Sequence, residues 1–186
     1  MKKKMIAPIF VSVIDLRYGS AAIGWSISEG MVKVSRIFLF GPGVSADKDI
    51  GEIFPDSPLS SCRDVEEIGN AIEGFLNGQD IKFSLSRLNL DCLTPFQRKV
   101  LTEVVFKIKW GSVMTYKGVA EKIGLKNGAR AVAGAVAANP FPIIIPCHRV
   151  IHSDGKTGGY LGGEEMKTQL LRMEGIEIDD RGKINP

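Results

Sequence analysis

Two short helical segments joined by a tight turn place the strongest constraint on the fold of this chain. Thr115 is a favourable N-cap for a helix over residues 116–123, and residues 124–127, Gly-Leu-Lys-Asn, are typical of a turn. A second helix follows over 128–138, and Pro140 prevents its extension because proline lacks a backbone N–H. This arrangement predicts a helix-turn-helix.

A capping box opens the part of the chain that carries these two helices. Thr94, Pro95 and Gln97 supply the N-cap, the N1 proline and the N3 glutamine of a helix that runs toward Lys109. A last helix is expected over residues 164–173, shortly before a glycine that is typical of a helix C-terminus. These features assign the C-terminal half to one mainly helical domain.

The N-terminal half has the pattern of a small α/β domain. Runs rich in Val, Ile and Phe predict a meander of three strands, over residues 9–16, 21–28 and 32–40. Apolar residues then recur at helical spacing over 65–76. This half shows neither a phosphate-binding loop nor a paired acidic cluster, so we expect it to act as a scaffold.

Length and composition fit two small domains. The chain has 186 residues, of which 44% are hydrophobic, so each half can bury a core. We place the boundary near residue 91, which gives an N-terminal scaffold domain over 1–91 and a C-terminal domain over 92–186. The predicted fold class is α/β, with strands and helices segregated as in α+β proteins.

Charge and cysteine content limit the partners, the metal sites and the cellular compartment that can be expected for the protein. The net charge of +3 permits nucleic-acid binding without demanding it. The cysteines Cys62, Cys92 and Cys147 form no CxxC pair, and we expect no metal site and a reducing compartment. No apolar run approaches the length of a membrane span, so we expect a soluble, cytoplasmic protein.

The segment 143–150, Ile-Ile-Ile-Pro-Cys-His-Arg-Val, is the most informative stretch for chemistry. A thiolate is the reactive form of cysteine, and a nearby positive charge or base depresses its pKa from about 8.5. Cys147 alone is better explained as a packed, inert cysteine; with His148 and Arg149 beside it, the two explanations are balanced. In an extended segment adjacent side chains point apart, so we expect a water between Cys147 and His148.

The predicted helix over 128–138 has almost no bulky side chains. Its sequence is Gly-Ala-Arg-Ala-Val-Ala-Gly-Ala-Val-Ala-Ala, with Arg130 as its one long cation. Small side chains allow the backbone to come close to a nucleic-acid groove. They also suit a helix buried against its neighbours, with Arg130 reaching out to solvent, and on this helix alone we favour that second explanation.

From Thr94 to Gly175 the chain resembles the catalytic domain of the O6-methylguanine-DNA methyltransferases. The resemblance rests on Pro-Cys-His-Arg-Val at 146–150, preceded by an Ala-Arg-Ala-Val helix and by an Asn-Pro pair at 139–140. It implies a ribonuclease H-like N-terminal α/β domain and a C-terminal domain similar to a winged helix-turn-helix. The N-terminal part of the resemblance is much weaker than the C-terminal part.

The resemblance also implies a reaction. Cys147 would accept an alkyl group from O6-alkylguanine in DNA by direct displacement, so that each molecule acts once as a methylated-DNA–[protein]-cysteine S-methyltransferase. His148 would act through water as the base, with Glu174 orienting its ring, the logic of a nucleophile, a base and an orienter. Asn139 would brace the turn that carries the cysteine. Activity toward O4-alkylthymine is left open.

Further roles follow from the same resemblance. Tyr116 would donate a hydrogen bond to the leaving base, and Arg130 would enter the stack of a flipped nucleotide. Val150 and the loop that contains Gly159 and Tyr160 would wall the pocket. The positions expected at the DNA surface are Gln97, Lys117 and Ser153. The expected partner is double-stranded DNA bound through its minor groove, by a monomer without cofactor or membrane attachment.

Two departures from the family qualify this expectation. Leu161 stands where some relatives carry a serine, so only its backbone amide is available to the base. The N-terminal half has no histidine, whereas some relatives bind zinc there, and we therefore expect no metal.

Three other functions explain this sequence less well. A non-catalytic alkyltransferase-like binder is disfavoured by Cys147, because such relatives usually have tryptophan there. A winged-helix transcription regulator needs donors and acceptors on its recognition helix, which the Ala-rich segment lacks. A cysteine hydrolase leaves the helix-turn-helix unexplained.

Overall fold

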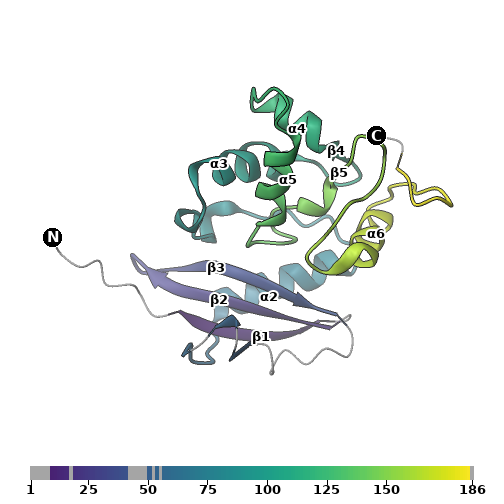
Figure 1. Cartoon of the computed structure of the whole chain (residues 1–186). Coiled ribbons are helices and arrows are strands. Elements are labelled where there is room, and N and C mark those ends of the chain that lie inside the picture. Colours follow the sequence, from purple (N-terminus) through teal and green to yellow (C-terminus); the bar gives the residue numbers. More distant parts are fainter. Residues whose placement is uncertain (1–8, 17–18, 42–49, 52, 55, 185–186) are drawn as a thin grey trace.

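The computed structural model consists of a sheet half and a helical half that lie against each other (Figure 1). It describes residues 9–16, 19–41, 50–51, 53–54 and 56–184. The predicted mixed α/β class, with an N-terminal sheet followed by a helical half, is confirmed. Among the described residues, no helix is both long enough and apolar enough to cross a membrane.

Three antiparallel strands form the N-terminal sheet in the order β1-β2-β3. They span Phe10–Leu16 (β1), Gly19–Ser28 (β2) and Met31–Phe40 (β3), which confirms the predicted meander. Glu29 and Gly30 connect β2 to β3 with positive φ angles of 51° and 75°. A two-residue turn of this kind matches the natural twist of a hairpin.

Helix α2 spans Arg63–Leu76 and packs on the sheet (Figure 1). Its buried residues recur at helical spacing, as predicted, at Val65, Ile68, Gly69, Ile72 and Phe75. Phe75 packs with residues of the helical half, including Ile143 and Leu170. The helix thus joins the sheet to the other half of the molecule.

The predicted capping box is present at the start of the helical half. The Gln97 side chain accepts a hydrogen bond from the Thr94 N–H at 2.9 Å, and the Thr94 hydroxyl accepts one from the Gln97 N–H at 3.3 Å. The helix begins as α3 (Pro95–Arg98), widens into a π-helical segment, η3 (Lys99–Val104), and tightens into a 3-10 turn, η4 (Val105–Lys107). The single regular helix expected toward Lys109 is therefore irregular.

The helix-turn-helix is formed by α4 (Tyr116–Lys122) and α5 (Ala129–Ala137). The Thr115 hydroxyl caps α4 by accepting a hydrogen bond from the Gly118 N–H at 3.0 Å. Asn127, in the turn between the helices, has a φ of 55°, a conformation that asparagine tolerates better than most residues. The bounds agree with the predicted helices to within one or two residues.

The rest of the helical half includes a short strand pair, two 3-10 turns and a last helix. Strand β4 (Met114–Thr115) pairs in parallel with β5 (Val150–Ile151). Helix α6 (Gly163–Met173) closes the fold, and Gly175 follows it with a φ of 82°. Two 3-10 turns, η1 (Leu85–Arg87) and η2 (Leu90–Cys92), lie between α2 and α3.

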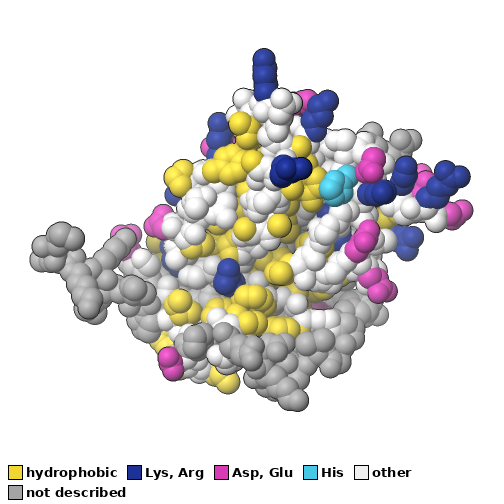
Figure 2. Space-filling model, viewed as in Figure 1, with side chains coloured by type: hydrophobic (Ala, Val, Ile, Leu, Met, Phe, Trp, Pro, Cys, Tyr) yellow, Lys and Arg dark blue, Asp and Glu magenta, His cyan; other side chains and the backbone are white. Residues whose placement is uncertain are grey.

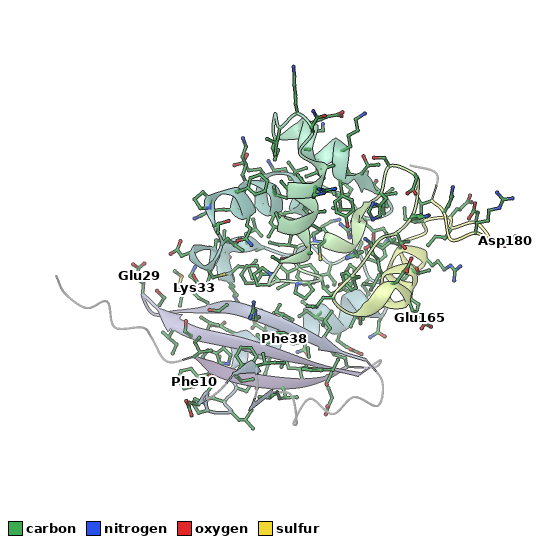
Figure 3. The ribbon with its side chains drawn as sticks, viewed as in Figure 1. Phe10, Glu29, Lys33, Phe38, Glu165 and Asp180 are labelled. Carbon is green, nitrogen blue, oxygen red and sulfur yellow. The ribbon has the colours of Figure 1, made fainter. Side chains whose placement is uncertain are left out.

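The two halves share one apolar core. It runs from strand residues such as Ile23 and Val34, through α2, to Val100 and Cys147. Figure 3 shows side chains filling the space between the sheet and the helices above it. The Ile37 N–H also donates to the Pro140 carbonyl at 2.9 Å, which ties β3 to the loop leading to Cys147. The domain boundary near residue 91 remains a prediction.

Candidate active site

Cys147 lies in a 3-10 turn, η5 (Cys147–Arg149), at the centre of the helical half. Residues 141–150 are all buried, and Cys147 is 8% exposed. The expectation of an extended segment is wrong here, because the Arg149 N–H donates to the Pro146 carbonyl at 3.0 Å and closes the turn. The alternation of side chains that was expected for Cys147 and His148 therefore does not apply.

The loop before Cys147 contains a strained residue. Ile143 has a φ of 70°, which is rare for a β-branched side chain, and it is 1% exposed. It packs with Phe75 and Leu170. Such conformations persist where the surrounding structure fixes them, and they concentrate at functional sites.

Asn139 links the two ends of this loop. Its Nδ2 donates to the Ile145 carbonyl at 2.9 Å, and its Oδ1 accepts from the Phe141 N–H at 3.0 Å. Its side-chain amide also acts on the Cys147 thiol in the direction that lowers the thiol pKa, which favours the thiolate. The structure thus places Asn139 at the turn that carries the cysteine.

A buried carboxylate joins the two residues that follow Cys147. Glu174 Oε1 lies 2.8 Å from His148 Nε2, and the Arg149 guanidinium donates to both Glu174 oxygens at 2.9 to 3.1 Å. Arg149 Nη1 donates to the Ile108 carbonyl at 2.5 Å. The Glu174 carboxylate therefore neutralises the charge of Arg149. The guanidinium points to this carboxylate rather than to the thiol of Cys147.

Burial sets the protonation of this group. The pKa of His148 is lowered, because the cost of burying a charged ring outweighs the stabilising effect of Glu174. Burial alone would raise the pKa of Glu174. Hydrogen bonds and charges from His148 and Arg149 outweigh this effect and lower the pKa of Glu174. His148 is then a neutral ring at neutral pH. Its Nε2–H donates to Glu174, and its Nδ1 offers a lone pair.

The cysteine itself departs from the expectation of a depressed pKa. Burial raises the pKa of Cys147, and the Asn139 hydrogen bond and the positive charge of Lys167 offset this only in part. The thiol is therefore the main form at neutral pH. A base must remove its proton when the reaction occurs, rather than a stable thiolate being held beforehand.

Lys167 is a buried charge that the sequence analysis missed. Its Nζ donates to the Val150 carbonyl at 2.7 Å and to the Thr157 carbonyl at 2.6 Å, and the residue is 1% exposed. Burial lowers its pKa to about 8. The signal was its position in α6: it precedes Leu170, Leu171 and Glu174 by three, four and seven residues, the spacing of one buried helix face.

The residues expected to wall the pocket lie around this turn. Tyr116 is 9% exposed, and burial followed by the nearby Cys147 raises its pKa, so it remains a neutral donor. The rings of His148 and Tyr160 meet edge-on with centroids 6.4 Å apart. Val150 is fully buried, whereas Gly159 is exposed on the loop.

Two polar atoms of this region have no hydrogen-bond partner. Among the described residues, the buried side-chain atoms without one are His148 Nδ1 and Tyr160 Oη. Buried polar groups are rarely left unpaired unless they serve a water or a ligand. The lone pair on His148 Nδ1 is therefore available to accept a proton, directly or through water.

The residues expected at the DNA surface lie apart from this buried group. Arg130 is exposed on α5, Lys117 on α4, and Ser153 on the turn after β5. Gln97 is half-buried and takes part in the capping box through its side-chain oxygen. On α5 the exposed residues are Arg130 and four small ones, Ala131, Gly134, Ala137 and the adjoining Ala138. The helix is thus only partly buried, with a smooth outer face.

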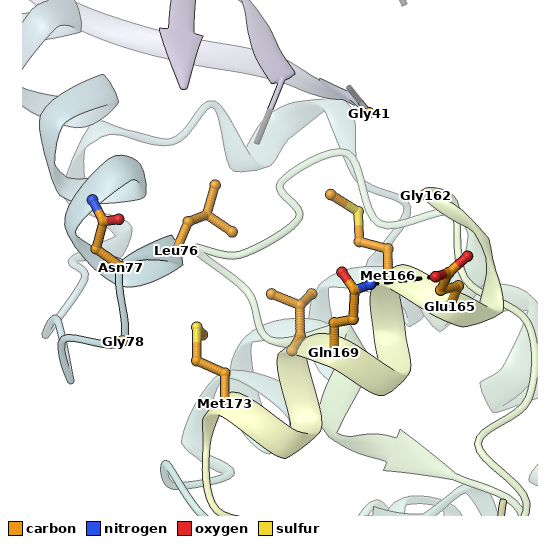
Figure 4. Close-up of a pocket in the computed structure, with 10 residues that line it drawn as sticks. Gly41, Leu76, Asn77, Gly78, Gly162, Glu165, Met166, Gln169 and Met173 are labelled. Atoms are coloured by element: carbon orange, nitrogen blue, oxygen red, sulfur yellow. Dashed lines mark hydrogen bonds between the residues drawn. The ribbon is translucent and has the colours of Figure 1, made fainter. Parts of the chain in front are cut away.

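A pocket of about 810 Å³ lies between the end of α2 and α6, but it is separate from this site (Figure 4). Its lining on α6 includes Met166, Gln169 and Met173, which lie on a different face of the helix from Lys167 and Glu174. Within the described part of the chain, no group of His, Cys, Asp or Glu is arranged to hold a metal ion.

Comparison with known protein sequences identifies relatives of the helical half. A family model described as the 6-O-methylguanine DNA methyltransferase, DNA binding domain, matches residues 95–176. The methylated-DNA–protein-cysteine methyltransferase of Methanothermobacter thermautotrophicus is 45% identical over 115 residues, which make up 62% of this chain and 64% of that protein. The chain therefore matches just under two thirds of the length of this relative.

Two solved structures share the fold over most of the chain. The O6-methylguanine-DNA methyltransferase of Pyrococcus kodakaraensis strain KOD1 has a TM-score of 0.68 at 31% identity, over 90% of this chain and 100% of that chain. The OGT protein of Mycobacterium tuberculosis, solved in complex with DNA, has a TM-score of 0.66 at 25% identity, over 89% and 92% of the two chains.

The fold and the site together define a class of protein: a sheet half joined to a helix-turn-helix half that holds a buried cysteine next to a histidine–carboxylate pair. With the relatives above, the chain belongs to the O6-methylguanine-DNA methyltransferase family.

The lowered pKa of His148 predicts how stability depends on pH. Below its ordinary pKa of about 6.5 the unfolded chain takes up a proton at this histidine while the folded chain resists it. The free energy of unfolding should therefore fall as pH drops below that value, by up to about 1.4 kcal/mol per pH unit. Denaturant unfolding of wild type and of His148→Gln at several pH values measures this. Equal slopes in the two proteins would contradict the assignment.

Proposed function

We propose that the protein repairs DNA by transferring an alkyl group from O6-alkylguanine to Cys147, once per molecule. The observation that supports this most strongly is the geometry beside the cysteine. His148 is neutral, its Nε2 is fixed by the buried Glu174, and its Nδ1 is free of partners. A thiol next to such a base is equipped to become a nucleophile when a substrate arrives.

The reaction requires one proton transfer and one displacement. His148 Nδ1 takes the thiol proton, through a water, and the Cys147 sulfur attacks the carbon attached to O6. The S–C bond forms as the C–O bond breaks, and the electron pair of the C–O bond stays on O6 of the leaving guanine. The Tyr116 hydroxyl stabilises the negative charge on this guanine by donating a hydrogen bond to it. The thioether product has no route back to a thiol, so the protein is consumed.

Lys167 supports the same step from the other side. Its positive charge acts on Cys147 in the direction that favours the thiolate. Its two hydrogen bonds hold the carbonyls of Val150 and Thr157, on either side of the turn after β5. Because its pKa is about 8, this charge begins to be lost as pH rises through that value.

The smooth outer face of α5 suits close contact with DNA. Ala131, Gly134 and Ala137 bring the backbone to the surface, and Arg130 is the one long cation of the helix. Figure 2 shows Lys and Arg side chains standing out mainly over the helical half, with uncharged surface between them. We infer that this half enters the minor groove, where Arg130 replaces a flipped nucleotide in the stack.

Other surface residues and properties complete the proposal. Lys117, Ser153 and the amide nitrogen of Gln97 would contact the DNA backbone, and Tyr160, Gly159 and Val150 would enclose the flipped base. The chemistry needs only groups of this chain, so we propose a monomer that acts without cofactor in the cytoplasm. The division of the chain near residue 91 belongs to the same proposal.

The first test is the identity of the acceptor. Incubation with duplex DNA containing O6-methylguanine should add one methyl group per molecule, and peptide mass spectrometry should place it on Cys147. Cys147→Ala should abolish transfer and keep lesion binding, because the thiol lies below the DNA-contacting surface. Cys92→Ala, which removes another free thiol, is the matched control and should transfer normally. Product in molar excess over protein would refute a single-use reaction.

The second test concerns Glu174. Glu174→Gln should slow transfer and move the rate profile to higher pH, because the neutral amide no longer favours a proton-accepting His148. The buried Arg149 also loses its counter-charge, so stability should fall by about 3–5 kcal/mol. Single-turnover rates from about pH 6 to about pH 9, measured where the variant is folded, give the profile. A folded variant with an unshifted profile would remove Glu174 from the mechanism.

The third test separates base flipping from chemistry. Arg130→Ala should slow repair of duplex DNA far more than reaction with free O6-methylguanine, because the free base avoids a flipping cost of a few kcal/mol. Arg172→Ala removes an exposed arginine from α6 and serves as the control. An equal loss by Arg130→Ala on both substrates would point instead to folding or to the chemical step.

A further inference from the structure

The second histidine of the chain lies beside the proposed base pocket. His152 follows directly after β5 and is exposed. Its ring meets that of Tyr116 edge-on, with centroids 5.1 Å apart and planes inclined at 63°. Such a contact favours one relative orientation of the two rings.

Gly158 marks the place where these side chains converge. A Cβ at this glycine would lie 2.7 Å from both Cδ2 and Nε2 of His152, and 3.6 Å from the Tyr116 hydroxyl. The imidazole edge therefore rests directly on the backbone of Gly158, with no room for a methyl group between them. The phenol oxygen lies against the same residue, at the loop that leads to Tyr160.

The turn that carries His152 is held in place on its other side. The His152 N–H donates to the Lys156 carbonyl at 2.9 Å, and the Gly155 N–H donates to the His152 carbonyl at 3.1 Å. Gly155 in turn accepts a hydrogen bond from the Ile184 N–H at 2.9 Å. The backbone of His152 is thus held by the hydrogen bonds of its turn, and its imidazole ring lies against the backbone of Gly158.

We propose that His152 is a positioning residue for Tyr116. Wedged between the phenol ring and Gly158, the imidazole keeps the Tyr116 hydroxyl directed at the leaving guanine as negative charge develops there. The inference rests on the proposed function, because it assigns a task to a residue of the same reaction. It acts by ring packing, so an aromatic ring of similar size should replace the imidazole.

Five proteins test this assignment: wild type, His152→Ala, His152→Phe, Tyr116→Phe and the double variant His152→Ala/Tyr116→Phe. Single-turnover methyl transfer is measured with free O6-methylguanine and with duplex DNA containing it. His152→Ala should be slower by about tenfold on both substrates, because a misplaced catalytic group loses rate steeply. His152→Phe should stay within about threefold of wild type, since the edge-on contact is retained.

The decisive comparison is the effect of His152→Ala in the wild-type protein and in Tyr116→Phe. Without the Tyr116 hydroxyl there is nothing left to position, so adding His152→Ala to Tyr116→Phe should change the rate by less than about twofold. The same loss in both backgrounds would overturn the proposal, as would a wild-type rate in His152→Ala. A loss confined to duplex DNA would also overturn it and make His152 a DNA contact. Failure of the wild-type protein to accept any methyl group would instead refute the proposed function itself.

Lys156→Ala is the matched control. It removes an exposed side chain from the same turn while keeping the backbone hydrogen bond that the His152 N–H makes. Its rate with free O6-methylguanine should equal that of wild type, because only the imidazole contacts Tyr116. A tenfold loss in this variant would show that the turn as a whole, rather than the ring, is responsible, and would overturn the assignment.

Discussion

The buried carboxylate of Glu174 is the interaction on which the rest of the site depends. It balances the charge of Arg149 and orients His148 within the core, where either charge alone would be costly to bury. The carboxylate comes from the end of α6, and its two partners come from the turn that carries Cys147. Helix α6 must therefore be in place before His148, the neighbour of Cys147, is oriented by Glu174. The reactivity of the cysteine thus depends on completion of the fold.

Burial keeps the Cys147 thiol in its protonated, less reactive form. The raised pKa of Cys147 keeps it protonated and protects it from exposed-thiol chemistry, while the neutral His148 waits as an acceptor. Under the proposed function the protein would be consumed by its own reaction, and it would gain from such an arrangement because a permanent thiolate would be lost to other electrophiles. Lys167 and Asn139 reduce the energy needed to form the thiolate without making it the resting state.

The sequence predicted those parts of the structure that local rules control. The strands, the capping box at Thr94, the caps and the helix-turn-helix all follow from periodicity and from residues a few positions apart. Contacts between distant segments did not follow from these local rules. The contact between His148 and Glu174 was expected only from the family resemblance, and the ion pair between Arg149 and Glu174, 25 residues apart, was not expected at all. The 3-10 turn at Cys147 was missed for the same reason, because the buried groups that surround it come from distant parts of the chain.

The N-terminal half does more than support the helices. Phe75, at the end of α2, packs against the strained Ile143 and also meets the His148 ring edge-on with centroids 5.8 Å apart. The same half fixes the loop through the hydrogen bond from Ile37 to Pro140. A positive φ at a buried isoleucine is unfavourable in isolation, so the loop needs this outside packing to persist. The sheet half, which carries none of the predicted catalytic residues, thus helps to determine where the His148 ring lies relative to Cys147.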